Sequence, residues 1–246
     1  MSYASTIHEV ETEDFSVRAL LIRGRRFCLV WDTLTHPRDM AVFAGSCADQ
    51  PCFVVYSHAD WDHVHGTAAL GTPLVIAHRA CLERFQGEAQ STLAAMQSRE
   101  PEKWSGITLV PPVITFDRHL DLDLGDISVS LHALPGHSPD SIVAFIPNLK
   151  LLLVGDAVEL PCPTIPAGCN LDAWIRSLQR WREHKGVRTV IPSHGPTGGK
   201  EILDATLEYL QGVRDGTPPK LSADATTFYQ SVHRDNLRNC GCHPAS

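Results

Sequence analysis

The order of hydrophobic and polar positions predicts a chain of alternating strands and helices. Short apolar runs rich in valine, leucine and isoleucine are typical of strands. In the first half of the chain they occupy residues 17–22, 27–32, 53–57 and 74–77. Six more follow at residues 113–116, 119–124, 127–134, 142–146, 151–154 and 187–191. Gly125-Asp126 and Pro147-Asn148 lie between such runs and predict two hairpin turns.

Helical patterns separate these strands. We expect helices over residues 37–48, from about residue 79, and over 88–99, 171–185, 200–213 and 221–237. Asp39 lies in the first turn of the first helix, Pro101 follows the end of the third, and Ser222 is the expected N-cap of the last. Residues 86–112 interrupt the strand pattern. This segment is either a lid over a site or a plain surface helix.

The order of the elements favours one fold class. Strands followed by a helix occur twice over, and this order fits two sheets packed face to face with helices outside. The predicted fold is therefore α/β (α+β layered), an αββα sandwich. The chain has no internal repeat, low-complexity tract or long linker, so we interpret residues 1–246 as a single domain.

The stretch from His58 to His63 carries the strongest chemical signal. His58, Asp60, Asp62 and His63 fall within six residues and follow the apolar run 53–57. A strand that ends in a short turn would bring all four side chains to one point at the edge of a sheet. Imidazole and carboxylate together suit a divalent transition metal that acts as a Lewis acid.

Three later positions have the same character. His137, Asp156 and His194 each come directly after a predicted strand, beside a glycine that lets the backbone approach a site closely. Strand ends are rigid places to hold ligands. One such residue alone would be a weak signal, but the whole set predicts a metal centre.

This set resembles the signature of the metallo-β-lactamase superfamily, and the resemblance covers nearly the whole chain. The superfamily has His-x-His-x-Asp-His, then a single His, a bridging Asp and a last His. Here Asp60 stands where the second His is usual. The resemblance implies an αββα sandwich with the metals at the rim between the sheets. It also implies that Asp32 supports the site from behind.

Carried over by position, the resemblance implies two metal ions. One would be held by His58, Asp60 and His137, the other by Asp62, His63 and His194, with Asp156 as the bridge. Zinc is the leading expectation. Asp60 adds a harder, charged donor, so iron and manganese are the alternatives. A carboxylate at this position also occurs, as Glu, in the superfamily's diiron oxygen-binding branch.

The implied activity is that of a binuclear metal-dependent hydrolase. A metal-bound hydroxide, oriented by Asp62 as the catalytic residue, would attack a small ester, thioester, lactone, amide or phosphoester. The alternative within the same fold is a diiron oxygen-binding or oxygen-reducing protein. It is disfavoured because aspartate is shorter than glutamate and no flavodoxin-like domain follows in the sequence. A non-catalytic scaffold is the remaining alternative.

Composition narrows the partners. The 246 residues carry a formal net charge of −7, whereas nucleic-acid and anionic-membrane binders need a basic face. We expect a small-molecule substrate, no nucleic acid and no membrane. The N-terminus lacks the pattern of a secretory signal, so the eight cysteines are expected to be reduced thiols in the cytoplasm. The sequence indicates no oligomeric state.

Several neighbours carry weaker predictions. We expect Asp140 to hydrogen-bond His137, His65 to be exposed, and residues 159–169 to form a wall facing the substrate. Cys240-Gly241-Cys242-His243 is interpreted as a frayed tail because it lacks metal-site spacing.

Overall fold

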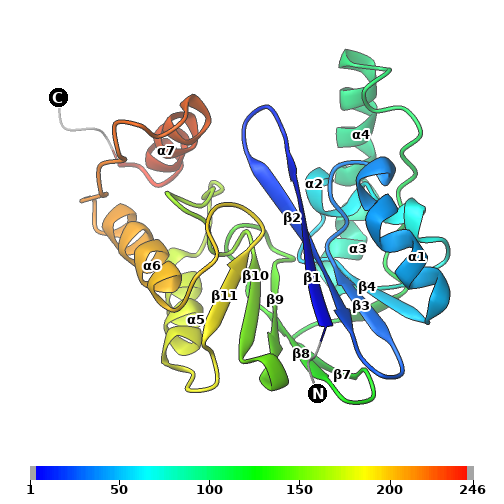
Figure 1. Ribbon diagram of the computed structural model, residues 1–246. Helices are drawn as coiled ribbons and strands as arrows, with labels where there is room; N and C mark the ends of the chain where they lie inside the picture. Colours follow the sequence, from blue (N-terminus) through cyan, green and yellow to red (C-terminus); the bar gives the residue numbers. More distant parts are fainter. Residues whose placement is uncertain (1–3, 243–246) are drawn as a thin grey trace.

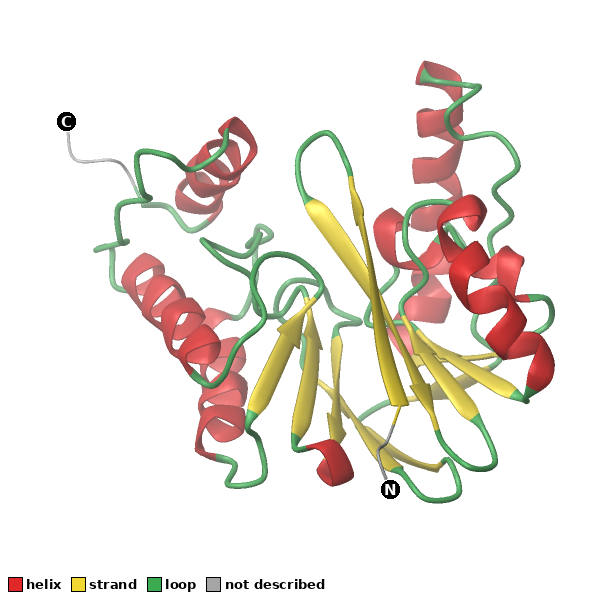
Figure 2. Cartoon of the chain, in the orientation of Figure 1, coloured by secondary structure: helices red, strands yellow, loops and turns green. Residues whose placement is uncertain are grey.

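The computed structural model describes residues 4–242 and contains two β-sheets packed between two layers of helices (Figures 1 and 2). The predicted αββα sandwich is confirmed. No helix among the described residues is both long and apolar enough to cross a membrane.

The first sheet has six strands in the order β1-β2-β3-β4-β5-β6. Strands β1, β2 and β3 are antiparallel neighbours, whereas β3, β4, β5 and β6 run parallel. The strands are β1 (Ala4–Glu11), β2 (Ser16–Arg23), β3 (Cys28–Trp31), β4 (Cys52–Val55), β5 (Leu74–His78) and β6 (Ile114–Phe116).

The second sheet has five strands in the order β11-β10-β9-β8-β7, and only its β10–β11 pair is parallel. The strands are β7 (His119–Asp123), β8 (Ser128–Ala133), β9 (Ile142–Ile146), β10 (Leu151–Gly155) and β11 (Thr189–Pro192). Strands β8, β10 and β11 therefore point the same way, and the segments that follow them leave the sheet at one edge.

Helices cover both outer faces (Figure 1). The first sheet carries α1 (Ala41–Asp49), α2 (Trp61–Val64), α3 (Arg79–Phe85) and α4 (Glu88–Arg99). The second carries α5 (Leu171–Glu183) and α6 (Glu201–Arg214), whereas α7 (Thr227–Asn239) lies beyond the end of α6 (Figure 1). Short 3-10 turns lie at Pro37–Met40, Thr67–Leu70 and Pro147–Leu149.

The apolar runs reflect burial on both faces of each sheet. In β2, Leu20 and Ile22 face the second sheet, whereas Ala19 and Leu21 pack in the layer that contains Phe43 of α1. β10 behaves alike, with Leu153 between the sheets. Successive side chains of a strand point to opposite faces of the sheet. A strand that is covered on both faces is therefore apolar along its whole length and does not alternate with polar residues.

Three local predictions were wrong. The edge strand β1 was missed because its segment is polar, and an edge strand needs only one apolar face. The last helix begins at Thr227 and is capped by Thr226, not Ser222. Cys240 and Cys242 pack against the core under α6, so the tail is ordered there; His243 lies outside the described residues.

Gly155 fixes the approach of the two sheets beside the predicted site. Its φ is +53°, a conformation that favours glycine. A Cβ built there would lie 2.8 Å from the Cβ of Ser57, at the end of β4. The close contact of the two sheets at this point therefore requires a residue without a side chain.

We predict that Gly155→Ala lowers the free energy of unfolding by about 2–4 kcal/mol, because left-handed strain and overpacking add. Gly216→Ala is the matched control: its φ is +72° but nothing lies within 4 Å of the new Cβ, so it should cost only about 1–2 kcal/mol. Urea denaturation measures both. Equal losses would contradict the packing argument.

Candidate metal centre

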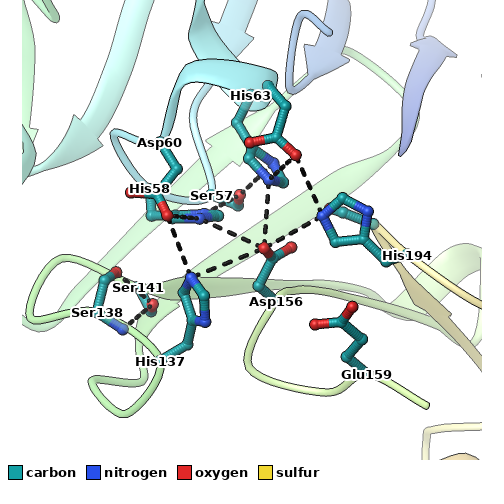
Figure 3. A network of polar contacts seen from close by, with 12 residues as sticks. Ser57, His58, Asp60, His63, His137, Ser138, Ser141, Asp156, Glu159 and His194 are labelled. Atoms are coloured by element: carbon teal, nitrogen blue, oxygen red, sulfur yellow. Dashed lines mark hydrogen bonds and ion pairs between the residues drawn. The ribbon is translucent and has the colours of Figure 1, made fainter. Parts of the chain in front are cut away.

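One carboxylate oxygen gathers four imidazoles from both sheets. Oδ2 of Asp156 lies 3.6 Å from Nε2 of His58 and 3.4 Å from Nε2 of His63. It lies 3.7 Å from Nε2 of His137 and 3.2 Å from Nε2 of His194. Figure 3 shows the four rings directed at this oxygen. The segments after β4, β8, β10 and β11 thus meet at one point. This agrees with the prediction that residues which follow strand ends form one centre.

The other two carboxylates divide these imidazoles into two groups. Asp60 Oδ2 lies 3.3 Å from Nε2 of both His58 and His137. Asp62 Oδ2 lies 3.5 Å from Nε2 of His63 and 3.3 Å from Nε2 of His194. The structure therefore brings all seven predicted residues together, in the two groups of three that the resemblance implies, each able to hold a metal ion.

Unpaired polar atoms show that these residues fit metal ions. Nε2 of His58, Nε2 of His63 and Oδ1 of Asp156 are buried without a hydrogen-bond partner among the described residues. A buried polar atom without a partner is costly. Divalent cations coordinated by these atoms would remove the cost, and nitrogen and carboxylate donors are a set that zinc, iron and manganese accept.

Hydrogen bonds behind two rings direct their free nitrogens to the centre. Nδ1 of His63 donates to Oδ2 of Asp32 over 3.0 Å, and Nδ1 of His194 donates to the carbonyl of Ser16 over 2.8 Å. A carboxylate oxygen and a carbonyl oxygen accept these bonds, so each ring donates from Nδ1 and directs Nε2 to the centre. When a metal ion binds, Nε2 can provide its lone pair.

Asp32 is fully buried and holds the end of β4 as well. Its Oδ1 accepts a hydrogen bond from the backbone of Ser57 at 2.7 Å, and Ser193 Oγ donates to its Oδ2 at 3.2 Å. Its φ of +57° places the carboxylate between the two sheets. This side chain supports the centre from behind, as the sequence predicted.

Arg84 on α3 was missed by the sequence analysis. One guanidinium nitrogen donates to Asp60 Oδ1 at 2.5 Å, and the other donates to Asp140 Oδ1 at 2.7 Å. Asp140 Oδ2 accepts from the backbone of Ala59 at 2.8 Å. The predicted contact between Asp140 and His137 was therefore wrong: Asp140 anchors Arg84 and the ligand-bearing turn instead. A lone arginine on a helix gave no signal in sequence.

The carboxylates of the site raise the pKa values of the neighbouring histidines. Burial would lower the pKa of His63, but Asp156, Asp62 and Asp32 outweigh it and raise that pKa well above its usual range. Burial alone would also lower the pKa of His137, yet Asp60 and Asp156 raise it to about 9. Because both pKa values are raised, protons compete with metal ions for these rings.

Aromatic side chains lie beside the centre. Phe15, in the turn between β1 and β2, packs edge-on against His194 with ring centres 4.7 Å apart, and it also contacts Phe228 of α7 at 5.1 Å. Trp61, between Asp60 and Asp62 in sequence, packs against Trp104 at 5.3 Å. Side chains of the β1–β2 turn and of α7 thus reach the neighbourhood of His194.

A cavity of about 180 Å³ lies beside Asp60. Its lining also includes Ala59, Trp61, His65, Arg84 and three residues of α4. The segment 86–112 therefore lies against the site and supplies a wall. His65 is buried between Trp61 and Trp104, so the prediction that it is exposed was wrong.

Glu159 is an unexpected carboxyl at the rim, close to Asp156 and His194 (Figure 3). It is 5% exposed, and the Tyr229 hydroxyl donates to its Oε1 at 2.8 Å. Burial raises its pKa to about 7. The loop beyond it packs inward, with Cys162 and Ile165 in the core, so only the start of the predicted substrate wall faces the site.

Comparison with known proteins decides the family. The sequence profile of the metallo-beta-lactamase superfamily matches residues 12–194 of this chain. This protein belongs to the metallo-beta-lactamase superfamily. The profile spans every residue of the centre, from Asp32 to His194.

Individual relatives in the superfamily are distant. A linear primary-alkylsulfatase of Pseudomonas sp. is 24% identical over 201 residues, covering 66% of this chain and 37% of the relative. A type 2 metallo-beta-lactamase of Bacillus sp. is 25% identical over 163 residues, covering 64% of this chain and 57% of the relative. The chain thus spans only part of the length of both.

Solved structures agree on the fold. A metallo-beta-lactamase from Pontibacter korlensis superposes with a TM-score of 0.65 at 20% identity, covering 85% of this chain and 99% of the other. An archaeal superfamily protein from Sulfolobus tokodaii gives 0.67 at 17% identity, covering 96% and 98%.

We predict that Glu159→Gln stabilises the metal-free protein at pH 8 by about 1–3 kcal/mol. The Glu159 pKa is raised from 4.5 to about 7, so the wild type loses stability as pH rises from 4.5 through 7, while the amide keeps the acceptor for Tyr229. At pH 4.5 and below the two proteins should unfold alike. Denaturant titration in chelator measures this.

The exposed Glu102→Gln is the control and should change stability at neither pH by more than about 0.5 kcal/mol. A difference between wild type and Glu159→Gln that is the same at pH 4.5 and pH 8 would contradict the burial argument.

Proposed function

We propose that this protein is a binuclear metal-dependent hydrolase for a small-molecule substrate. The observation that supports the proposal most strongly is the pair of groups, each of two histidines and one aspartate, that share Asp156. Under this proposal His58, Asp60 and His137 hold one ion, and Asp62, His63 and His194 hold the other. Zinc is the expected metal, with iron and manganese as alternatives.

The bound metals and the side chains would have different roles in the reaction. Two bound dications would supply Lewis acidity and would lower the pKa of a bound water toward ~7. Asp62 is the proposed catalytic residue: it is 5% exposed and beside the shared centre, so its carboxylate can accept a hydrogen bond from the attacking water and orient it. Asp32 and the Ser16 carbonyl keep two histidine rings aligned throughout.

The family and the site support the proposed substrate class. Both curated relatives are named for hydrolytic activities, an alkylsulfatase and a metallo-beta-lactamase. The alkylsulfatase adds sulfate esters to the esters, thioesters, lactones, amides and phosphoesters expected from sequence. The narrow cavity beside Asp60 favours a small leaving group or acyl group.

A specific observation favours a second candidate. Two imidazoles and one carboxylate form the ligand set of many non-haem iron sites, and here that set occurs twice. The second candidate is a diiron oxygen-binding or oxygen-reducing protein supplied with electrons by a separate partner. Iron as the retained metal together with an oxygen-sensitive visible spectrum and no esterase activity would favour it over the hydrolase.

Arg84 limits how far Asp60 favours iron or manganese. The guanidinium shares the charge of Asp60 at 2.5 Å and is itself largely shielded from solvent. The pair therefore presents one carboxylate oxygen to the metal with part of its charge neutralised. This arrangement keeps zinc as the expected ion.

We predict that His137→Ala and Asp156→Ala each lose at least one metal ion per chain. Hydrolysis should fall at least about 100-fold, since even partners of metal ligands typically contribute 10- to 100-fold. His119→Ala, an exposed histidine on β7, is the control and should keep full metal content. Elemental mass spectrometry and an ester, lactone, sulfate-ester and phosphoester panel measure both. Unchanged metal in both variants would contradict the assignment.

We also predict that Asp60→His increases the ratio of zinc to manganese retained from an equimolar mixture by about tenfold or more, because a neutral, softer donor replaces a carboxylate. Glu88→Gln is the matched control: it removes another carboxylate that binds Arg84 but lies outside the two ligand groups. A ratio that is equal in wild type and Asp60→His would place Asp60 outside the ligand set.

A further inference from the structure

Three cysteines lie together at the opposite edge of the first sheet. Cys28 is the first residue of β3 and Cys52 the first residue of β4, and the two are paired in the parallel register. Cys47 lies in the last turn of α1 and points at the same place. The candidate metal centre follows the other ends of these strands, at Asp32 and His58. The thiol cluster is therefore a separate location.

The sulfur atoms are close enough to share one ion. All three Sγ atoms lie within 4.8 Å of one another, and those of Cys47 and Cys52 are 3.2 Å apart. Three thiolates around one metal, with bonds of about 2.3 Å, would be roughly 4 Å apart. Small side-chain rotations reach that spacing. The 3.2 Å separation is far longer than the ~2.05 Å bond of a disulfide.

The surroundings permit entry from one side. Cys28 is fully buried, whereas Cys47 and Cys52 are half-buried and line an open hollow of about 310 Å³. Hydrogen bonds with Cys47 and Cys52 lower the pKa of Cys28, whereas the hydrogen bond with Cys28 raises that of Cys47. The Arg23 guanidinium binds Ser46, next to Cys47, and its positive charge makes a smaller contribution that lowers both pKa values. All eight cysteines are described and unpaired in disulfides, and the other five do not form a group of three.

We propose that Cys28, Cys47 and Cys52 form a site for one thiophilic d10 ion, Zn²⁺ or Cu⁺. Thiolates select such soft ions, whereas the histidine–aspartate centre offers harder donors. Three thiolates alone suit Cu⁺; Zn²⁺ would add a water or small anion from the open hollow as its fourth ligand. Each thiol that binds loses its proton to solvent. The ion would join the end of α1 to the starts of two central strands.

The test uses the optical signature of sulfur. Metal-free, reduced full-length protein is titrated with Cd²⁺, as a reporter for Zn²⁺, and separately with Cu⁺ under a competing chelator. The histidine–aspartate centre contains no sulfur, so thiolate-to-metal charge transfer in the ultraviolet reports binding to cysteine and not to that centre. We expect the band to saturate at one thiolate-bound ion per chain, while the histidine–aspartate centre takes up to two further equivalents without adding to the band. Zn²⁺ and Cu⁺ are then allowed to compete for the site. The ion with the lower dissociation constant is the occupant.

Substitutions and cysteine alkylation show which cysteines produce the charge-transfer band. Cys47→Ser and Cys52→Ser should reduce the affinity at least 100-fold, whereas Cys169→Ser, half-buried elsewhere, should not change it. In the wild type, the amount of metal that saturates the band should protect these three cysteines from alkylation and no others, as read by peptide mass spectrometry. This second measurement needs no variant to fold.

Three results would overturn the proposal. The first is no charge-transfer band after three equivalents, which are enough to fill the histidine–aspartate centre as well. The second is a band that persists in both variants. The third is alkylation of the three cysteines at equal rates with and without metal. Loss of metal from the histidine–aspartate centre affects none of these readouts, so the proposal stands or fails independently of the hydrolase function.

Discussion

The arrangement of the centre depends on the negative charge of one buried carboxylate, Asp156, and on the four imidazoles that surround it. Asp156 is 7% exposed, and its Oδ2 is surrounded by four imidazoles at 3.2–3.7 Å that come from both sheets. Burial would raise the pKa of Asp156, but His194, His63 and His58 hold it well below its usual range. The sandwich supplies this geometry: β8, β10 and β11 end at one edge, and β4 ends opposite them, with Gly155 allowing the sheets to meet.

The same electrostatic reasoning explains the residues around the centre. Asp32 takes the Nδ1 proton of His63 into a hydrogen bond, and Arg84 shares the charge that Asp60 brings in place of the usual histidine. Asp140 and Glu88 in turn hold Arg84. A carboxylate substituted into a ligand set is thus accompanied by a cation. That compensation makes Asp60 compatible with zinc as well as with harder metals.

The sequence predicted those features that depend on short segments of the chain. Apolar runs predicted ten of the eleven strands in the described part of the chain, and all seven predicted ligand positions follow strand ends in an order typical of the superfamily. The contacts it missed are long-range and made by residues ordinary in sequence. Arg84 reaches Asp60 and Asp140 from α3, Glu159 is buried by α7, and His65 is enclosed by Trp104. Edge strand β1 was missed because its polar face resembles a loop.

We propose that the seven side chains bind two metal ions around Asp156. Anomalous X-ray diffraction from crystals grown with excess zinc would locate the ions. We expect two peaks at the strand ends, one within the group His58, Asp60 and His137 and one within the group Asp62, His63 and His194, each within bonding distance of Asp156. A single peak at this centre, or none, would rule out a binuclear site.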